Sequence, residues 1–556
     1  MSPGRPVVLV SLLLTLCLVA TACGEDGRSE STGAGGAEPD KGGTLVIGAE
    51  QEPRCADWVS SCAGASWGVW TIQAFTMPRS YDVTEDARRR ASPLLTGEPR
   101  LEQGPPMKVT YQISEQAVWS DGTPITSSDF KYTWQQIMTG TDIFDRTGYE
   151  DIATVDDSRP KSVVVTYKQP YAAWEDLFGG FYGIYPKHLL EGKDRNAEMK
   201  DGYTFSGGPW IIAHWTKGQE VKLVPNPRYW GTRPRLDAVV FRYITDTAAY
   251  QQAYKTGQVA AIYPQAQPEV AQLKGLPDTR FDVATGLQYE ALWFNAAKPP
   301  LDSKAVRLAL AYATDRRVIV SQLFGPVQPG IEPIEAFMTP ANEEWYSRPF
   351  TRYRRDLARV DQLMHGDGWA KGADGIWAKG GQRAALELAT TAGNHRRELT
   401  QQIVQSQWKD AGFEVRANNP PAATLIGDWL PQGAFQVALY AQQPPSTDPG
   451  LCPVFCSKNI PSPANAGSGQ NYTRLASPVV DELWQRVDRE LDRSKRKALV
   501  DQGHAALADE LPGLPIDPFP DIVVYNSTKV SGPVGHNFVY GPFWNVHLWS
   551  CRGGSC

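Results

Sequence analysis

The sequence contains little histidine, and what it has does not cluster. Its seven histidines are scattered between His188 and His547, and none belongs to a His-Glu-x-x-His or comparable ligand pattern. No glycine-rich loop followed by Lys-Ser or Lys-Thr is present, so the usual phosphate-binding motif is missing too. The sequence therefore predicts no metal site and no cofactor.

An excess of basic charge is also missing. The formal net charge is -6 at pH 7, and the charges are not clustered. Proteins that bind nucleic acids need basic stripes or patches that neutralise phosphates. We therefore expect no nucleic-acid partner.

Only one long apolar run occurs, and it lies at the N-terminus. Arg5 precedes an apolar stretch that ends at Ala22 and is shorter than a membrane-spanning helix requires. A small residue before Cys23 is typical of bacterial lipoprotein processing. Residues 1–22 are thus predicted to be a signal peptide, with Cys23 as the acylated first residue of the mature chain. A plain secretory signal that is cut nearby is the alternative.

Large apolar side chains are almost absent from residues 23–43, which are rich in Gly, Ser, Glu and Asp. Such a segment cannot bury enough surface to become ordered, so we predict a flexible tether. A lipid, a tether and then a folded domain predict a protein held at the extracellular face of a bacterial cell membrane. Two or more acyl chains would hold it far more firmly than one.

Cysteine is sparse, with eight residues in the chain. Cys17 leaves with the signal peptide and Cys23 takes the lipid, so six remain in an exported chain, where disulfides persist. They fall into three close pairs, which predicts the short-loop disulfides Cys55–Cys62, Cys452–Cys456 and Cys551–Cys556. Zinc binding at the second pair is the alternative, but no nearby Cys or His completes a ligand set.

The mature chain is too long for one hydrophobic core, which predicts two or three lobes. Short alternating strands mix with amphipathic helices, so the pattern indicates a mixed α/β fold. We expect strands at 43–48, 162–167 and 238–244, one helix over 305–323, and a helix pair within 477–511. The buried stripe of the single helix is expected to contain Val306, Leu310, Ala313, Val320 and Leu323.

Residues 109–134 contain the most informative pattern. Alternation from Val109 to Ile113 predicts a strand, Asp121-Gly122 predicts a tight turn, and the polar run that starts at Thr126 predicts the N-cap of a helix. As a sequence, this segment resembles the hallmark of the extracellular solute-binding proteins of the peptide/nickel class (family 5). These proteins are substrate-binding lipoproteins of ABC importers, and they include the dipeptide- and oligopeptide-binding proteins.

The resemblance extends from about residue 43 to the C-terminus. Further segments carry it in the family's order: 207–210, 221–230, 293–295, 306–316, 471–472, 478–481 and 512–516. It implies a two-lobed, periplasmic-binding-protein-like α/β fold with a hinge, a central cleft and an extra N-terminal subdomain. The implied domains are lobe I at 44–63, 187–290 and 521–556, the extra subdomain at 64–186, and lobe II at 291–520.

The resemblance also implies a function. It indicates a monomeric receptor without enzymatic activity that captures a peptide or another polar oligomeric solute and delivers it to an ABC permease. An oligosaccharide or a modified metabolite stays open as the ligand, and ligand sensing stays open as the role. Nickel is disfavoured because no His or Met is obviously placed to bind it.

One catalytic pattern does occur, at residues 64–68. Gly-Ala-Ser-Trp-Gly fits the G-x-S-x-G nucleophile elbow of serine hydrolases. That elbow requires an apolar strand directly before it and a helix after it. Here the preceding residues look like a loop closed by Cys55 and Cys62. A serine hydrolase is therefore a remote alternative, and we expect Ser66 to begin a helix or to line the cleft.

Family members contact their ligands from the first strand and its loop, from the crossover strands, and from a loop of the second lobe. Matching these places residue by residue, the resemblance implies eight ligand-binding residues: Gln51, Glu52, Tyr289, Trp293, Asn295, Tyr440, Gln442 and Gln443.

The chain departs from the family in the loop of the second lobe. Members that bind free peptides usually have an aspartate four residues before the proline of this loop, where it pairs with the peptide's α-ammonium. This chain has Pro445 there, and Asp448 is expected to be a structural loop acid. A buried ammonium without a partner is costly. Unmodified di- to tetrapeptides are thus predicted to bind poorly, unless Glu52 or Glu290 supplies the missing charge.

Overall fold

The computed structural model describes residues 41–60, 62, 66–85, 88–140, 142–180, 183–444, 446–554 and 556. The predicted signal peptide, Cys23 and most of the predicted tether lie outside the described residues, and so does Pro445. Within those ranges, the search for a helix with the length and apolar character to cross a bilayer finds none.

A seven-stranded mixed sheet contains the first strand of the described chain. β1 (Thr44–Ala49) pairs in parallel with β10 (Ala238–Tyr243) and β11 (Ala261–Ile262) at the centre of the sheet. The remaining strands complete the order β12-β21-β11-β1-β10-β9-β8, with bounds Thr279–Thr285, Pro520–Asn526, Glu220–Pro225 and Trp210–Thr216 for β12, β21, β9 and β8. The predicted strands at 43–48 and 238–244 are therefore confirmed.

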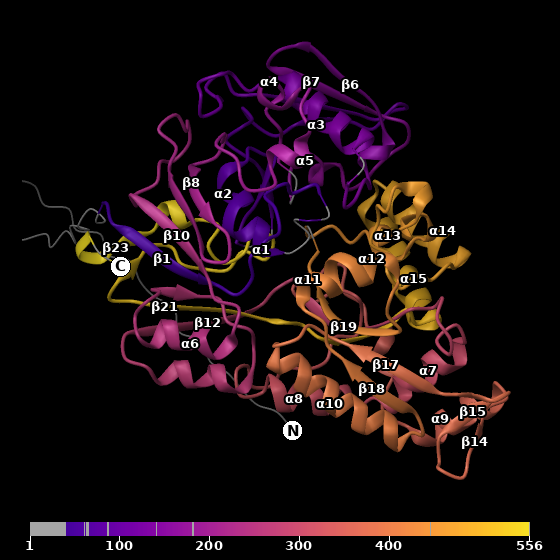
Figure 1. The fold of residues 1–556 in the computed structure, drawn as a ribbon. Coiled ribbons are helices and arrows are strands. Elements are labelled where there is room, and N and C mark those ends of the chain that lie inside the picture. The colour runs from indigo at the N-terminus through magenta and orange to yellow at the C-terminus, as the bar shows by residue number, and fades with distance from the viewer. Residues whose placement is uncertain are drawn as a thin grey trace, which may run out of the picture. The chain divides into compact units, whose positions relative to one another are not determined.

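A five-stranded mixed sheet, with the order β18-β17-β19-β13-β20, lies apart from the first sheet, among the orange elements of Figure 1. Its strands are β18 (Glu414–Asn418), β17 (Ala385–Ala389), β19 (Val437–Gln442), β13 (Tyr289–Phe294) and β20 (Gly513–Asp517). β17 runs parallel to both neighbours, whereas β13 is antiparallel to β19 and β20. β13 is buried along its whole length, as expected of a central strand that is covered on both faces.

A four-stranded antiparallel sheet lies in the N-terminal part, in purple in Figure 1. Its order is β4 (Arg100–Glu102), β5 (Lys108–Gln112), β7 (Ser162–Tyr167) and β6 (Ile152–Arg159), and helix α3 (Ser127–Thr139) packs against β6. The N-cap predicted in the run from Thr126 is present, and it takes the form of a capping box in which the Thr126 N–H donates to Asp129 Oδ2 at 2.8 Å. The predicted strand–turn–helix is thus confirmed.

Two of the remaining helices test the sequence prediction directly. The single helix expected over 305–323 is wrong in one respect: it is two helices, α7 (Lys304–Ala313) and α8 (Arg316–Leu323). Asp315 caps α8 by accepting from the N–H groups of Arg317 and Val318, which ends the first helix early. The apolar stripe is nevertheless buried as predicted.

The helix pair expected within 477–511 is confirmed. α14 (Pro478–Arg489) and α15 (Arg493–Glu510) pack against each other, and Asp492 caps the second. The other helices are α1 (Ser66–Gly68), α2 (Ala74–Thr76), α4 (Lys187–Leu190), α5 (Arg195–Glu198), α6 (Thr247–Lys255), α9 (Leu357–Gly366), α10 (His395–Asp410), α11 (Ala422–Thr424), α12 (Leu430–Gln432) and α13 (Cys452–Phe455). Short strands complete the description: β2 (Tyr81–Val83), β3 (Arg89–Ala91), β14 (Ala370–Lys371), β15 (Trp377–Lys379), β16 (Gln382–Arg383), β22 (Val530–Ser531) and β23 (Ser550–Cys551).

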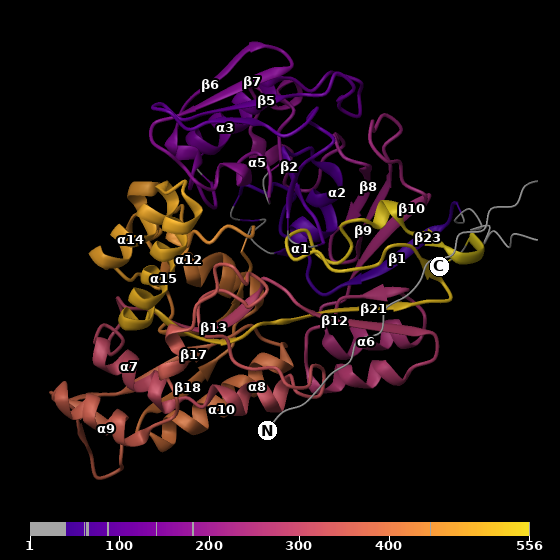
Figure 2. The same ribbon diagram turned by 180° about the vertical axis from the view of Figure 1, so that it is seen from behind.

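The chain passes between the two large sheets twice. Residues 286–288 join β12 to β13, and residues 518–519 join β20 to β21 (Figure 2). Alternate residues of the seven-stranded sheet enter different cores. Ile522 and Val524 belong to the core of the five-stranded sheet, whereas Val523 belongs to the core shared with the four-stranded sheet. The predicted domain boundaries stay a prediction.

All three predicted disulfides are present: Cys55–Cys62, Cys452–Cys456 and Cys551–Cys556. Each closes a loop within one short segment, so none of them links the two large sheets. The zinc alternative for the second pair does not apply, because a disulfide consumes both sulfurs.

Candidate solute-binding site

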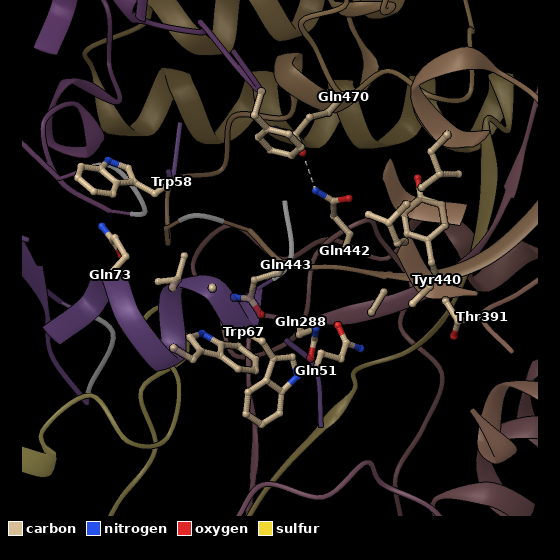
Figure 3. Close-up of a pocket in the computed structure, with 18 of the residues that line it drawn as sticks. Gln51, Trp58, Trp67, Gln73, Gln288, Thr391, Tyr440, Gln442, Gln443 and Gln470 are labelled. Carbon is tan, nitrogen blue, oxygen red and sulfur yellow. Dashed lines mark hydrogen bonds between the residues drawn. The ribbon is translucent and has the colours of Figure 1, made fainter. Parts of the chain in front are cut away.

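A cavity of about 200 Å³ opens where the two large sheets and the N-terminal part meet. Gln51 follows β1, Trp67 lies in α1, and Gln73 ends the π-helical turn between α1 and α2. Tyr440 and Gln442 belong to the end of β19 on the other side. Both crossing segments contribute to the wall, through Gln288 and Phe519, and Figure 3 shows Gln288 among the lining side chains. A molecule in this cavity would therefore touch both lobes.

The polar part of the wall is neutral and rich in amides. Seven glutamines line it: Gln51, Gln73, Gln265, Gln288, Gln442, Gln443 and Gln470. Several are held in place by the protein. Gln442 donates to Gln470 Oε1 at 3.2 Å, the contact dashed in Figure 3, and Gln443 donates to the Phe538 carbonyl at 2.7 Å. Each amide offers donors and acceptors, which suits ligands with many neutral polar groups.

Gln73 and Trp58 carry polar atoms that lack partners. Gln73 is 1% exposed, and neither its amide nitrogen nor its amide oxygen has a hydrogen-bond partner among the described residues. The indole N–H of Trp58 is likewise buried and unpaired there. Figure 3 shows both side chains on one side of the cavity, opposite Tyr440 and Thr391. Buried polar groups are normally satisfied, so these atoms are available to bond a molecule in the cavity.

Aromatic rings form the apolar part of the wall. Trp67, Trp70 and Tyr263 pack edge to face, with ring centroids 5.3–6.1 Å apart. Trp58 stacks on Tyr185 with centroids 4.5 Å apart, so its orientation is fixed. Rigid aromatic walls bury the apolar faces of a ligand at little cost in conformational entropy.

Asp145 and Arg397 are the only charged side chains among the described residues that line this cavity. Arg397 is already engaged, since it donates to Glu290 at 2.6 Å and to Thr391 at 3.0 Å. Burial raises the pKa of Asp145, and its oxygens accept from the Thr147 N–H and the Gln470 amide. The cavity thus presents a largely uncharged surface.

The structure brings four of the eight predicted ligand-binding residues together: Gln51, Tyr440, Gln442 and Gln443 all line the cavity. Tyr440 and Gln442 belong to strand β19, not to the loop in which the sequence placed them, because the strand continues further than expected. Tyr289 lines a smaller, adjacent cavity.

The other three do not line either cavity. Glu52 accepts from the Trp215 indole at 2.8 Å and from the Gly218 N–H, so its carboxylate is used within lobe I. Trp293 is fully buried and donates to the Tyr440 carbonyl, and Asn295 is fully buried and donates to the carbonyl of Phe435. Trp293 supports the wall from behind, because its ring stacks on Tyr440 with centroids 5.2 Å apart.

Sequence reasoning missed Trp58, Trp67, Gln73 and Gln470 as lining residues. The Gly-x-Ser-x-Gly pattern drew attention to the neighbourhood of Trp67 for a different reason. α1 begins at Ser66, as one of the two expectations had it. The described residues between β1 and α1 form turns and contain no strand, so the context that a nucleophile elbow requires is missing there.

Two lobes joined by two crossing segments, with a polar cavity lined by both, define a solute-binding receptor. The comparisons with known proteins agree. Residues 102–460 match the family described as "Bacterial extracellular solute-binding proteins, family 5 Middle". This match covers more than half of the chain, so the protein belongs to that family, as the resemblance predicted.

Individual relatives are more distant. The oligopeptide-binding protein OppA of Mycobacterium tuberculosis is 26% identical over 466 residues, which cover 82% of this chain and 76% of OppA. The oligopeptide-binding protein AppA of Bacillus subtilis is 25% identical over 534 residues, covering 91% and 92%.

Solved structures show the same fold. A periplasmic EDTA-binding protein, EppA, aligns with a TM-score of 0.82 and 23% identity, covering 92% of this chain and 97% of EppA. Bacillus subtilis AppA in complex with a nonapeptide aligns with a TM-score of 0.81 and 20% identity, covering 93% and 100%. The two-lobed α/β fold expected from the sequence is therefore confirmed.

Proposed function

We propose that this solute-binding protein captures a polar oligomeric solute in the first cavity and delivers it to an ABC permease. In this proposal it acts as a monomer and without enzymatic activity, and a lipid at Cys23 holds it at the extracellular face of the membrane. A peptide is the first candidate, since OppA and AppA are oligopeptide-binding proteins by name. The neutral amides and indoles of the wall also favour an oligosaccharide.

The unpaired amide of Gln73 is the observation that carries the proposal. Its donors and acceptor are buried in a cavity that both lobes line. A polymer of amide or hydroxyl groups supplies complementary partners at short, regular intervals. Leaving such a group unpaired costs about 1–3 kcal/mol, and a bound ligand would recover this cost.

Mass spectrometry under native conditions tests capture directly. The mature protein, purified from its own host, is expected to retain a small polar solute. After the solute is removed by unfolding and refolding, calorimetry should show that it binds again. We expect Gln73→Leu to weaken rebinding roughly tenfold, since at least one ligand hydrogen bond is lost.

Gln252→Leu is the matched control for this experiment. Gln252 is exposed on α6, away from both cavities, so the same chemical change should leave affinity unaltered. A protein that retains no solute, and that binds neither peptides nor oligosaccharides, would overturn the proposed function.

The membrane anchor is tested separately. Replacing Cys23 with Ser removes the thiol that accepts the lipid, so the variant should move from the membrane fraction to the soluble fraction after cell fractionation. Cys17→Ser, a change within the predicted signal peptide, is the control and should leave the protein in the membrane fraction. A Cys23→Ser protein that stays with the membranes contradicts the lipoprotein assignment.

A further inference from the structure

A second cavity, of about 100 Å³, adjoins the first. Asp145, Gln442 and Gln470 line both cavities, so a solute in the first can extend into the second. The lining of the second cavity comes from the N-terminal part on one side and from lobe II on the other. Its chemistry differs from that of the neutral cavity.

Four carboxylates line the second cavity: Asp145, Asp176, Asp448 and Asp488. They come from separate segments of the chain, and the described lining residues include no Lys, Arg or His. Two of the four form ion pairs with arginines that do not line the cavity. Arg89 pairs with Asp176 at 2.9 Å, and Arg496 pairs with both oxygens of Asp448 at 2.7 Å.

The other two lack a cationic partner among the described residues. Asp145 accepts only from neutral donors, the Thr147 N–H and the Gln470 amide, each at 2.9 Å. The carboxylate of Asp488, on α14, has no direct ion pair within the described part of the chain. Arg496 and Lys458 attract its charge, but they pair directly with Asp448 and Glu150 instead. The cavity therefore contains two acidic groups that no direct ion pair of the described residues neutralises.

Tyr289 provides an independent sign that a ligand belongs here. Its side chain is fully buried and lines the cavity, yet its hydroxyl has no hydrogen-bond partner among the described residues. Native structures seldom leave such a group unsatisfied, since the loss of solvation costs free energy that nothing repays. Phe337 and Met338 add apolar wall beside it.

Metal binding does not account for these acids. Within the described residues, no group of three or more His, Cys, Asp or Glu side chains has the arrangement to hold a metal ion. An organic cation fits better, because an ammonium has three N–H donors and a guanidinium has five. Carboxylate oxygens and the tyrosine oxygen can all accept them.

We propose that the second cavity is a subsite for an ammonium or guanidinium group of the solute whose neutral part occupies the first cavity. This inference rests on the proposed function. The cation is supplied by a basic side chain or α-ammonium of a peptide, or by the amine of an amino sugar. Its charge-assisted bonds to Asp145 and Asp488 then replace the partners that the protein does not provide.

Binding of a cation should depend on pH. Burial, and then the charge of Asp448, raise the pKa of Asp488 to about 7, although Arg496 and Lys458 favour its ionised form. Burial raises the pKa of Asp176 to about 6 despite Arg89, and it raises that of Asp145, whereas Arg496 keeps the pKa of Asp448 low. A bound cation favours the ionised carboxylate, so binding near pH 6 should release a proton and should weaken as the pH falls further below 7.

Two matched pairs of probes test the subsite in calorimetric titrations of the mature protein. The first pair is N-acetyl-Gly-Lys-Gly-amide and the same peptide with an acetylated lysine. The second is the glucosamine trimer and the N-acetylglucosamine trimer. In at least one pair the cationic member should bind roughly tenfold to hundredfold more tightly at pH 7, where the sugar amines still carry protons. The pair that shows the preference identifies the source of the cation.

Variants then locate the preference. Asp488→Asn and Tyr289→Phe should each weaken binding of the cationic member while leaving the neutral member almost unchanged. Glu482→Gln removes one charge from an exposed position of the same helix, so it should have no effect. Equal binding of both members of each pair, or an unchanged preference in Asp488→Asn, would overturn the subsite.

The retained solute from the native host separates this inference from the proposed function. We expect that solute to carry an ammonium or guanidinium group. A neutral or anionic solute whose binding depends on Gln73 would overturn the subsite and leave the proposed function standing. If no solute is retained and no probe binds, the proposed function fails, and the subsite fails with it.

Discussion

Gln73 is the side chain for which an empty cavity has the clearest energetic cost. Its amide is buried without a partner among the described residues, and burying such a group has an energetic cost that hydrogen bonds to a ligand would offset. Binding proteins often contain local features that lower stability and raise affinity. If Gln73 lowers stability in this way, its replacement should change the stability of the ligand-free protein as well as the affinity for a ligand.

In the free protein, Gln73→Leu should raise the free energy of unfolding by about 1 kcal/mol, because an unsatisfied polar group is replaced by an apolar one of similar size. Urea denaturation of the ligand-free protein measures this change. Gln252→Leu, on the exposed face of α6, serves as the reference. Destabilisation by Gln73→Leu would show that the amide has partners of its own, such as ordered water.

Glu290 is a buried acid with the opposite role. Burial alone would raise its pKa, but Arg396 and Arg397 outweigh burial and lower the pKa of Glu290 to about 2. The ion pairs join β13 to the start of α10, next to the first crossing segment. A lowered pKa stabilises the folded state above the ordinary pKa of glutamate, and this contribution is lost as the pH falls towards 2.

Glu290→Gln should therefore destabilise the protein at pH 7 by about 3–5 kcal/mol, since it leaves two arginines buried without their carboxylate. The difference from the unmodified protein should shrink on acidification below about pH 4, where the glutamate of the unfolded chain becomes protonated. Thermal unfolding across pH tests both statements. Glu387→Gln on β17, which β19 separates from β13, is the control, and an equal effect there would contradict the assignment.

The residues of the site were only partly predictable. Gln51 and Gln443 follow segments that the family resemblance identifies, so their positions could be inferred. Gln73 and Trp58 could not, because nothing in their local sequence separates a cavity residue from a core residue. Asp488 could not be predicted either. Its sequence position on an amphipathic helix is typical of a solvent-exposed acid, and only the packing of the N-terminal part against α14 encloses it.

At the level of secondary-structure elements, local patterns were reliable where capping chemistry is explicit. Thr126 and Asp129 set the start of α3, and Asp492 sets the start of α15. The split between α7 and α8 was missed because the 3.6-residue apolar period continues through Thr314 and Asp315. Asp315 decides the outcome by capping the second helix, and an apolar period cannot reveal that.

The disulfide Cys452–Cys456 closes the single turn of α13, which borders the second cavity through Pro453 and Val454. Replacing both cysteines with serine should lower the free energy of unfolding by about 2 kcal/mol, since the cross-link restricts the unfolded chain. It should also weaken binding of cationic probes more than of neutral ones.

Urea denaturation and calorimetry of the double variant measure these effects. The Cys551–Cys556 pair closes a loop of similar length and lines neither cavity, so removing it should reduce stability without changing either affinity. Equal losses of affinity in both double variants would contradict a local role for α13.

At the level of the whole molecule, contacts across the cavities indicate a closed arrangement. The Ala172 N–H donates to the Asp488 carbonyl at 2.7 Å, and the Ser446 hydroxyl donates to Asp176 at 2.6 Å. These bonds connect the N-terminal part to lobe II. A ligand that touches both sides favours such a state to the extent that it binds the closed form more tightly than the open one.

Solution scattering should therefore show a smaller radius of gyration when the solute is bound, and tryptophan fluorescence should change because Trp58 and Trp67 line the cavity. Ser446→Ala, which removes one bond across the cavities, should favour the open form and reduce affinity severalfold. Tight binding with neither signal would indicate a rigid, preformed pocket.

The sequence predicted this architecture through its resemblance to the family, and the two crossings between the sheets follow it. The resemblance did not predict which protein carboxylates would pair with a positively charged group of the ligand. The departure at Pro445 suggested that free ammonium groups would lack a partner, and neither Glu52 nor Glu290 reaches the cavities. Asp145 and Asp488 are more than three hundred residues apart in sequence, so only the folded chain shows that they line one cavity.

The most direct test of this account is a crystal structure of the protein with the solute it retains from its native host. We predict that the solute lies between the lobes, that its polar groups bond to the Gln73 amide, and that its cationic group approaches Asp488 and the Tyr289 hydroxyl. A solute bound elsewhere, with the Gln73 amide bonded only to protein or water, would contradict the account.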